Sequence, residues 1–136
     1  MPAPSALKPG LELAFSFSIS SDMMAAFGLI SGDHHPLHIN DDYAVSHGFE
    51  RRVVYGGLLV AQVSRLIGAE LPVKHCVWTR LQIEFREPLY IDQRAEMTAS
   101  IVNVAEAVSA LTLKFRIARE TRLIGRGSAD VLFSDD

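Results

Sequence analysis

The sequence predicts one α+β domain in which an antiparallel sheet wraps around a long central helix. Residues 58–71, about four helical turns, are apolar on almost every face, and the second half of the chain instead places apolar residues at every second position. The first pattern is typical of a buried helix and the second of strands with one covered face. The 136 residues fit a single domain, 1–136.

The elements before the long helix follow from local signals. Apolar residues alternate strictly with small polar ones over residues 13–19, which predicts a half-buried strand. Ser20 offers a capping oxygen to a short helix that Gly32 would end. Residues 31–48 are polar and interrupted by a proline, so we expect a loop there, with one turn around residues 41–45.

Four further strands are expected after the long helix. Apolar residues alternate over residues 77–85, 95–101 and 111–117, and a last apolar stretch covers 123–133. In the first of these stretches the covered face would carry Val77, Thr79, Leu81, Ile83 and Phe85. Because a small open sheet leaves unpaired edges, pairing with a second copy is expected.

Composition and charge exclude several classes of protein. The formal net charge of −3 and the lack of a basic run beyond Arg51-Arg52 argue against a nucleic-acid partner. Cys76, the single cysteine, excludes an intramolecular disulfide and a zinc site of several thiolates, and fits a reducing compartment. The N-terminus lacks the apolar core of a secretory signal, and no apolar stretch reaches membrane-spanning length. We expect a soluble cytoplasmic protein with no membrane partner.

Three histidines and one carboxylate lie within residues 33–38. His34 and His38 have the spacing of two metal ligands on one helical face, but Pro36 between them disfavours a helix, so no metal site is expected. Asp33 and His38 are instead a candidate acid–base pair, because histidine titrates near neutral pH and burial can tune a carboxylate. The structural alternative stays open, with Asp33 capping a turn and His38 packed as an ordinary side chain.

Gly56 and Gly57 precede the long apolar segment. Glycine lets a ligand approach the backbone closely, and a helix N-terminus presents free N–H groups with a partial positive charge. This combination can hold an oxyanion. Close packing of the entering chain against a strand explains the two glycines equally well.

Residues 31–38, Ser-Gly-Asp-His-His-Pro-Leu-His, resemble the hydratase motif of the MaoC-like, (R)-specific enoyl-CoA hydratases. The usual form of that motif is Ser-Gly-Asp-x-Asn-Pro-Leu-His, followed by an acidic residue and Tyr-Ala. Residues 49–64 resemble the family's approach to its central helix, and residues 81–89 its strand ending in Phe-x-x-Pro-Leu/Val. The resemblance implies the hot-dog fold, a long helix wrapped by a curved antiparallel sheet, and a homodimer or dimer of dimers.

The resemblance also implies an activity, the reversible addition of water to trans-2-enoyl thioesters of CoA or acyl-carrier protein, which yields (R)-3-hydroxyacyl thioesters. No cofactor is implied beyond the phosphopantetheine thioester that carries the substrate. Asp33 and His38 take the place of the family's catalytic pair, and the Gly56 N–H that of its oxyanion donor. His35, Tyr55 and Gly57 would lie beside the substrate.

Three positions depart from the family's pattern. His35 replaces an asparagine, Asn40 an acidic residue, and Tyr55 a histidine before the helix glycine. Because histidine can still donate and accept hydrogen bonds, we expect His35 to preserve activity with an altered pH profile.

Two other functions remain as alternatives. The run from Tyr55 to Leu58 also resembles the His-Gly-Gly opening of the central helix in hot-dog thioesterases, but the next two turns offer only Gln62 and Ser64 rather than a carboxylate. A non-catalytic subunit that binds acyl thioesters would use basic residues, with Arg51, Arg52 and Arg65 as candidates.

Overall fold

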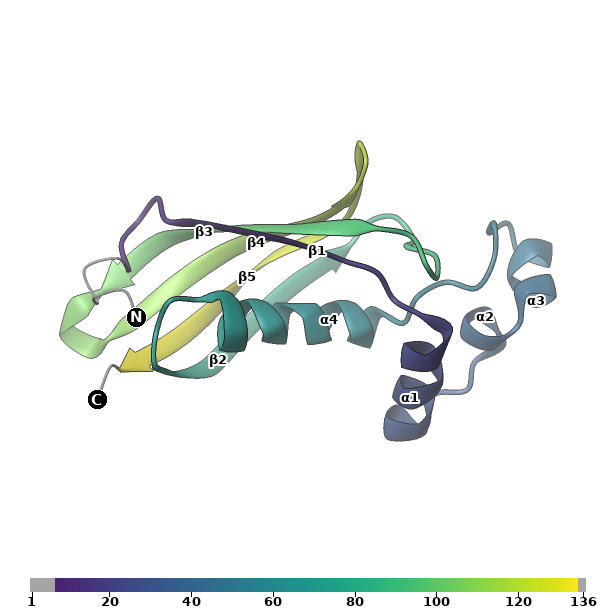
Figure 1. The fold of residues 1–136 in the computed structure, drawn as a ribbon, viewed down its shortest axis with the longest axis horizontal. Helices are drawn as coiled ribbons and strands as arrows, with labels where there is room; N and C mark the ends of the chain where they lie inside the picture. Colours follow the sequence, from purple (N-terminus) through teal and green to yellow (C-terminus); the bar gives the residue numbers. More distant parts are fainter. Residues whose placement is uncertain (1–6, 135–136) are drawn as a thin grey trace.

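The computed structural model describes residues 7–134 and contains one five-stranded antiparallel sheet with the strand order β1-β3-β4-β5-β2. The strands are β1 (Glu12–Phe17), β2 (His75–Phe85), β3 (Ala95–Ala105), β4 (Ala110–Arg119) and β5 (Arg122–Ser134). The helix α4 (Gly56–Arg65) lies along one face of this sheet and continues as the π-helix η2 (Leu66–Glu70) (Figure 1). A single turn of 3₁₀ helix, η3 (Glu106–Val108), joins β3 to β4. The predicted α+β class is confirmed.

The core lies between α4 and the inner face of the sheet. The helix contributes four buried apolar residues, Leu59, Val63, Leu66 and Ile67. The strands contribute their alternate apolar positions, such as Met97, Ile101, Leu113 and Ile117, which are all at most 1% exposed. The strand periodicity therefore predicted the covered face of the central strands correctly.

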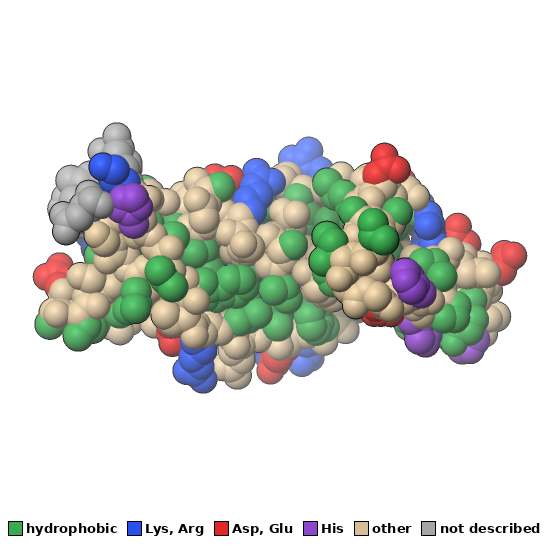
Figure 2. Space-filling model, turned by 90° about the horizontal axis from the view of Figure 1, so that it is seen from below, with side chains coloured by type: hydrophobic (Ala, Val, Ile, Leu, Met, Phe, Trp, Pro, Cys, Tyr) green, Lys and Arg blue, Asp and Glu red, His purple; other side chains and the backbone are tan. Residues whose placement is uncertain are grey.

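The prediction that the long helix is buried all round is wrong for the isolated protomer. The helix runs from Gly56 to Glu70, close to the predicted span, but the sheet covers one side only. Apart from Arg65, the exposed positions are small residues: Gly57, Ala61, Ser64, Gly68 and Ala69. Figure 2, which views this side of the molecule, shows apolar side chains gathered along its middle. Small side chains allow close approach of another surface, so this face is suited to a protein contact.

Strand β2 corrects a second expectation. Its register against β5 shifts between Trp78 and Arg80. The bulge reverses the alternation, so that Cys76 and Trp78 pack on the core while Val77 is 63% exposed and Thr79 is exposed. Leu81 and Ile83, which lie beyond the bulge, pack on the core as predicted. Phe85 ends the strand and is 53% exposed.

Three helices precede α4 and lie at its N-terminal end, beyond the end of the sheet (Figure 1). They are α1 (Ser21–Ser31), α2 (Pro36–Ile39) and α3 (Asp41–Ser46). As predicted, the Ser20 hydroxyl accepts a hydrogen bond from the Met23 N–H at 3.2 Å, and Gly32 ends α1 with a positive φ of 74°.

The segment predicted as a loop contains one helical turn more than expected. The turn expected at 41–45 exists as α3, whereas α2 was missed. Pro36 occupies the first position of α2, where a missing N–H costs nothing, so the residue that we took as a breaker instead starts a helix. No helix within residues 7–134 combines the length and hydropathy needed to cross a bilayer.

Candidate active site

His38 lies on α2 with its ring held from two sides. Its Nδ1 atom is 2.7 Å from the carbonyl oxygen of Val53. Because a carbonyl oxygen can only accept a hydrogen bond, Nδ1 carries the proton and Nε2 of the neutral ring is left with a free lone pair. The ring also stacks on Tyr55, with 4.2 Å between centroids and 27° between planes. His38 is therefore oriented as a proton acceptor through Nε2.

Asp33 lies in the connection between α1 and α2, on the surface. Its N–H donates to the Ser31 hydroxyl at 3.1 Å, and its Oδ1 atom accepts from the His35 N–H at 3.0 Å. Its carbonyl oxygen accepts from the Tyr55 hydroxyl at 2.6 Å. Within the described part of the chain, the second carboxylate oxygen has no hydrogen-bond partner. Asp33 therefore does form the turn that the structural alternative proposed, and it still offers one oxygen for chemistry.

His35 caps α2. Its Nδ1 atom accepts a hydrogen bond from the Leu37 N–H at 3.1 Å, so the proton of the neutral ring resides on Nε2. The ring presents its edge to His38 at 6.3 Å and to Tyr43 of α3 at 5.7 Å. His35 therefore caps a helix at the position where the family's motif has asparagine, a residue that also caps helices well.

The cap requires a lone pair on His35 Nδ1. A ring that carries a proton on both nitrogens has no such lone pair, so the bond from the Leu37 N–H would be lost and α2, which carries His38, would loosen. The charged or titratable groups facing His35 are Asp33, His38 and Tyr43. We expect His35→Asn to keep activity, because asparagine also caps helices well, and to change the pH profile of kcat/KM, because an amide cannot gain a proton as an imidazole can. His34→Asn, at the exposed neighbouring histidine, should leave the profile unchanged. Superimposable profiles for wild type and His35→Asn would contradict this role.

Tyr55 is the buried link of the cluster, with only 1% of its surface exposed. Besides bonding Asp33 and stacking on His38, its ring lies 4.8 Å from that of Phe27 in α1. Burial, and secondarily the negative charge of Asp33, raises the pKa of the Tyr55 phenol. The hydroxyl therefore stays protonated and donates throughout the physiological pH range.

Gly56 begins α4, and its N–H has no acceptor within the described part of the chain. An added Cβ at Gly56 would lie 3.1 Å from the Phe85 ring, and one at Gly57 would overlap the Phe27 ring. The packing explanation therefore holds for Gly57, although the partner is a helix residue rather than a strand. At Gly56 close packing and a free N–H coexist, so a ligand role for this backbone remains a proposal.

The overlap at Gly57 predicts a loss of stability in Gly57→Ala. Because the Phe27 ring must move, we expect the free energy of unfolding to fall by about 1–3 kcal/mol. Phe27→Ala removes the ring that the methyl group would meet, so Gly57→Ala added to Phe27→Ala is the matched control and should not lower stability further. Urea unfolding of the wild type, the two single variants and the double variant measures the difference. A Gly57→Ala variant as stable as the wild type would show that Phe27 yields without cost.

The structure thus brings Asp33, His35, His38 and Tyr55 into one cluster directly before Gly56. Gly57 faces Phe27. Within residues 7–134 no group of three or more His, Cys, Asp or Glu side chains could hold a metal ion. Sequence reasoning missed the carbonyl of Val53, which fixes the His38 tautomer, because a backbone carbonyl leaves no signal in the side-chain pattern.

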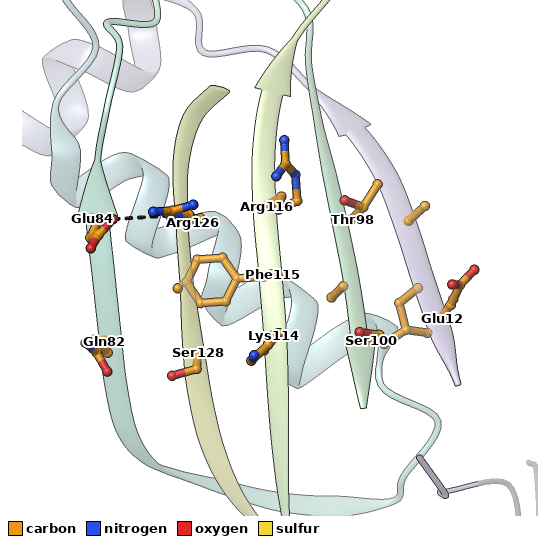
Figure 3. A pocket seen from close by; sticks show the side chains of 14 residues that line it. Glu12, Gln82, Glu84, Thr98, Ser100, Lys114, Phe115, Arg116, Arg126 and Ser128 are labelled. Carbon is orange, nitrogen blue, oxygen red and sulfur yellow. Dashed lines mark hydrogen bonds and ion pairs between the residues drawn. The ribbon is translucent and has the colours of Figure 1, made fainter. Parts of the chain in front are cut away.

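A separate open hollow of about 940 Å³ lies on the face of the sheet turned away from α4 (Figure 3). Its walls are mainly outward-facing polar side chains from all five strands, among them Glu84, Lys114, Arg116 and Arg126. The hollow contains none of the candidate catalytic residues, and Glu84 and Arg126 pair across it at 3.2 Å. It therefore plays no part in the site at α2 and α4.

Comparison with known proteins agrees with this arrangement. The solved (R)-hydratase from A. caviae involved in PHA biosynthesis superposes with a TM-score of 0.90 at 28% identity, covering 97% of this chain and all of that one. The unliganded R-hydratase PhaJ1 from Pseudomonas aeruginosa has a TM-score of 0.88 at 20% identity, covering 97% of this chain and 85% of that one, and shows the same fold. The fold is therefore the hot-dog fold of the (R)-hydratases.

Sequence relatives place the chain more closely. Residues 5–115 match the MaoC like domain family, so the chain belongs to this family. The (R)-specific enoyl-CoA hydratase of Aeromonas caviae is 29% identical over 111 residues, which are 82% of this chain and 83% of the relative. The mitochondrial 3-hydroxyacyl-[acyl-carrier-protein] dehydratase of Arabidopsis thaliana is 30% identical over 109 residues, 80% of this chain and 64% of the relative. The family resemblance of the motif is thereby confirmed.

Proposed function

We propose that this protein is a hydro-lyase that adds water reversibly to trans-2-enoyl thioesters of CoA or acyl-carrier protein, giving (R)-3-hydroxyacyl thioesters. The observation that carries the proposal is the oriented His38, whose Nδ1 is committed to Val53 and whose Nε2 is free to take a proton, in one cluster with Asp33. The hydratase and dehydratase relatives support the same reaction.

Each group has a defined task in this reaction. Asp33 and His38 hold one water molecule, and the pair takes a proton from it as its oxygen bonds to Cβ of the substrate. The electron pair of the double bond moves toward the thioester, whose oxygen becomes negatively charged. The N–H of Gly56, aligned with the dipole of α4, stabilises that charge. The pair then returns one proton to Cα, so the enzyme ends unchanged.

The proposal includes a second copy of the chain. Strand β2 is an edge of the sheet, and beside it α4 exposes a face of small residues. Val77 and Phe85 of β2 are more than half exposed in the protomer. Pairing two such edges would satisfy their backbone groups and cover this apolar area, giving a homodimer or a dimer of dimers. Light scattering on the purified protein measures the assembly directly.

The proposal also specifies the number of domains, the cofactors, the partners and the state of the single cysteine. Residues 1–136 form one catalytic domain, and the chemistry requires no metal or cofactor besides the carrier of the substrate. Nucleic acid and membranes are not partners. Cys76 is a free thiol, and burial raises its pKa, so it is a poor nucleophile and fits a reducing, cytoplasmic setting.

Two alternatives are weaker on specific contacts. A thioesterase of this fold usually carries a carboxylate on the central helix, whereas Glu70 lies at its far end and pairs with Arg65 at 3.2 Å, so that only Asp33 could serve. A subunit that only binds thioesters would use the three arginines, but Arg52 already pairs with Asp41 at 3.4 Å and Arg65 also lies over the Phe15 ring at 4.0 Å. The hydratase function is favoured because the fold orients Asp33 and His38, the side chains that hydration needs.

The test follows crotonyl-CoA and a longer enoyl-CoA by loss of the ultraviolet absorbance of the enoyl thioester, with a thiol reagent in a parallel sample. Hydration removes the absorbance and releases no thiol. Stoichiometric thiol release would identify a thioesterase. No change of either signal with a folded protein would contradict hydration of these CoA thioesters, and would point to a carrier-bound or specialised substrate or to a subunit that only binds thioesters.

A further inference from the structure

We infer that Tyr55 is a positioning residue that fixes the backbone of Asp33 and the ring of His38 together. The inference rests on the proposed hydratase function and assigns a task within it. One end of the side chain, the hydroxyl, donates to the Asp33 carbonyl at 2.6 Å, and its ring face stacks on His38 at 4.2 Å. Asp33 and His38 come from different segments, and Tyr55 is the side chain that touches both.

The Tyr55 side chain is itself held tightly, as a positioning residue must be. Phe27 packs against its ring at 4.8 Å, and an added Cβ at Gly28 would lie only 3.2 Å from its hydroxyl oxygen. Because Tyr55 is 1% exposed, its hydroxyl is sheltered from water and is itself the donor to the Asp33 carbonyl. The raised pKa of the phenol keeps that donor protonated.

Tyr55 also connects the pair to the proposed oxyanion donor. It immediately precedes Gly56, and its carbonyl oxygen accepts from the Leu58 N–H at 3.0 Å in the first turn of α4. The three proposed functional groups thus meet at one residue. The family's pattern has histidine at this place, so the hydroxyl contact with Asp33 is provided by the tyrosine of this chain.

The inference predicts a selective loss of turnover in Tyr55→Phe. The ring and its stacking remain, but the Asp33 carbonyl loses its donor, and the peptide unit that follows Asp33 gains freedom to rotate. Small misplacements of reacting groups reduce rates strongly, by as much as about 100-fold for 1 Å. We expect kcat to fall about 10-fold, with KM changed less than about 2-fold, because the contact orients the pair and does not bind the substrate.

Tyr90→Phe is the matched control. Tyr90 is also buried, at 5% exposure, and its hydroxyl also has one backbone partner, the Glu50 N–H at 3.1 Å. Each variant removes one tyrosine hydroxyl and, with it, one hydrogen bond to the backbone. The melting temperatures of the two variants should therefore fall by similar amounts. A purely structural role of Tyr55 would lower kcat equally in both variants or in neither.

Gly28→Ala supplies an independent test. Its methyl group would press on the Tyr55 hydroxyl, while its contacts with His34 Nδ1 at 3.6 Å and the Asp33 carbonyl at 3.7 Å are ordinary. We expect Gly28→Ala to lower kcat in the wild-type background and to have no further effect in Tyr55→Phe, where the hydroxyl is gone. Equal losses in both backgrounds would overturn the inference. If Tyr55→Phe does not fold, an unchanged kcat for Gly28→Ala alone overturns it.

The failure of this inference differs from the failure of the proposed function. An active wild type, inactive Asp33 and His38 variants and an unchanged Tyr55→Phe would overturn the positioning role alone. A folded wild type without activity on any enoyl thioester would overturn both. Loss of kcat in Tyr55→Phe, with unchanged kcat in Tyr90→Phe, supports the role.

Discussion

Replacing His38 with alanine is expected to lower kcat for hydration by about 100- to 10,000-fold, the range of acid–base catalysis by a positioned side chain. The variant loses the free Nε2 that takes the proton of water, and it also leaves the Val53 carbonyl without its donor. That second loss costs only about 1 kcal/mol of stability, so the fold is retained and the lost rate reports on chemistry.

His47→Ala is a close control for this prediction. His47 Nδ1 lies 2.8 Å from the Tyr43 carbonyl, and its ring stacks on Tyr43 with 4.0 Å between centroids. It therefore has the same two kinds of contact as His38, but at the end of α3 and away from Asp33. We expect wild-type kcat for His47→Ala. A His38→Ala variant that keeps more than about a tenth of wild-type turnover would contradict the assigned role.

The second large effect is expected for Asp33→Asn, again about 100- to 10,000-fold in kcat. The amide oxygen still accepts from the His35 N–H, so the turn before α2 is preserved, but the negative charge that helps to draw a proton from water is gone. Raising the pH should not restore kcat in Asp33→Asn, because an amide has no proton to lose.

Asp41→Asn controls for the isosteric change itself. Asp41 Oδ1 also accepts from a backbone N–H, that of Arg52 at 2.9 Å, at the first residue of α3. Its conversion to asparagine should leave kcat within about 2-fold of wild type. Circular dichroism of both variants verifies the fold. Similar activity for Asp33→Asn and wild type would limit Asp33 to the structural role of forming the turn.

The fold was predictable where periodicity is strong. The apolar faces of β3 and β4 and the span of α4 with η2 follow from spacing, because burial on one side enforces these periods. The bulge in β2 was not predictable, because Thr79 is compatible with either face and the alternation continues through it. The exposed face of α4 was misjudged because Gly and Ala count as apolar whether or not anything covers them.

The candidate site was predictable in its side chains and not in its geometry. Asp33 and His38 stand out by residue type and motif, and the structure places them in one cluster. What orients them is a backbone carbonyl at Val53, a cap at His35 and a buried phenol at Tyr55. These contacts depend on where α2 lies against the start of α4, which no local pattern in the sequence reveals.

The most direct test of the central claim is the rate at which purified protein removes the absorbance of crotonyl-CoA, measured side by side for wild type, Asp33→Asn and His38→Ala. We predict steady loss of absorbance without thiol release for the wild type, and at most about 1% of that rate for either variant. Equal rates for all three folded proteins would contradict an acid–base pair at Asp33 and His38.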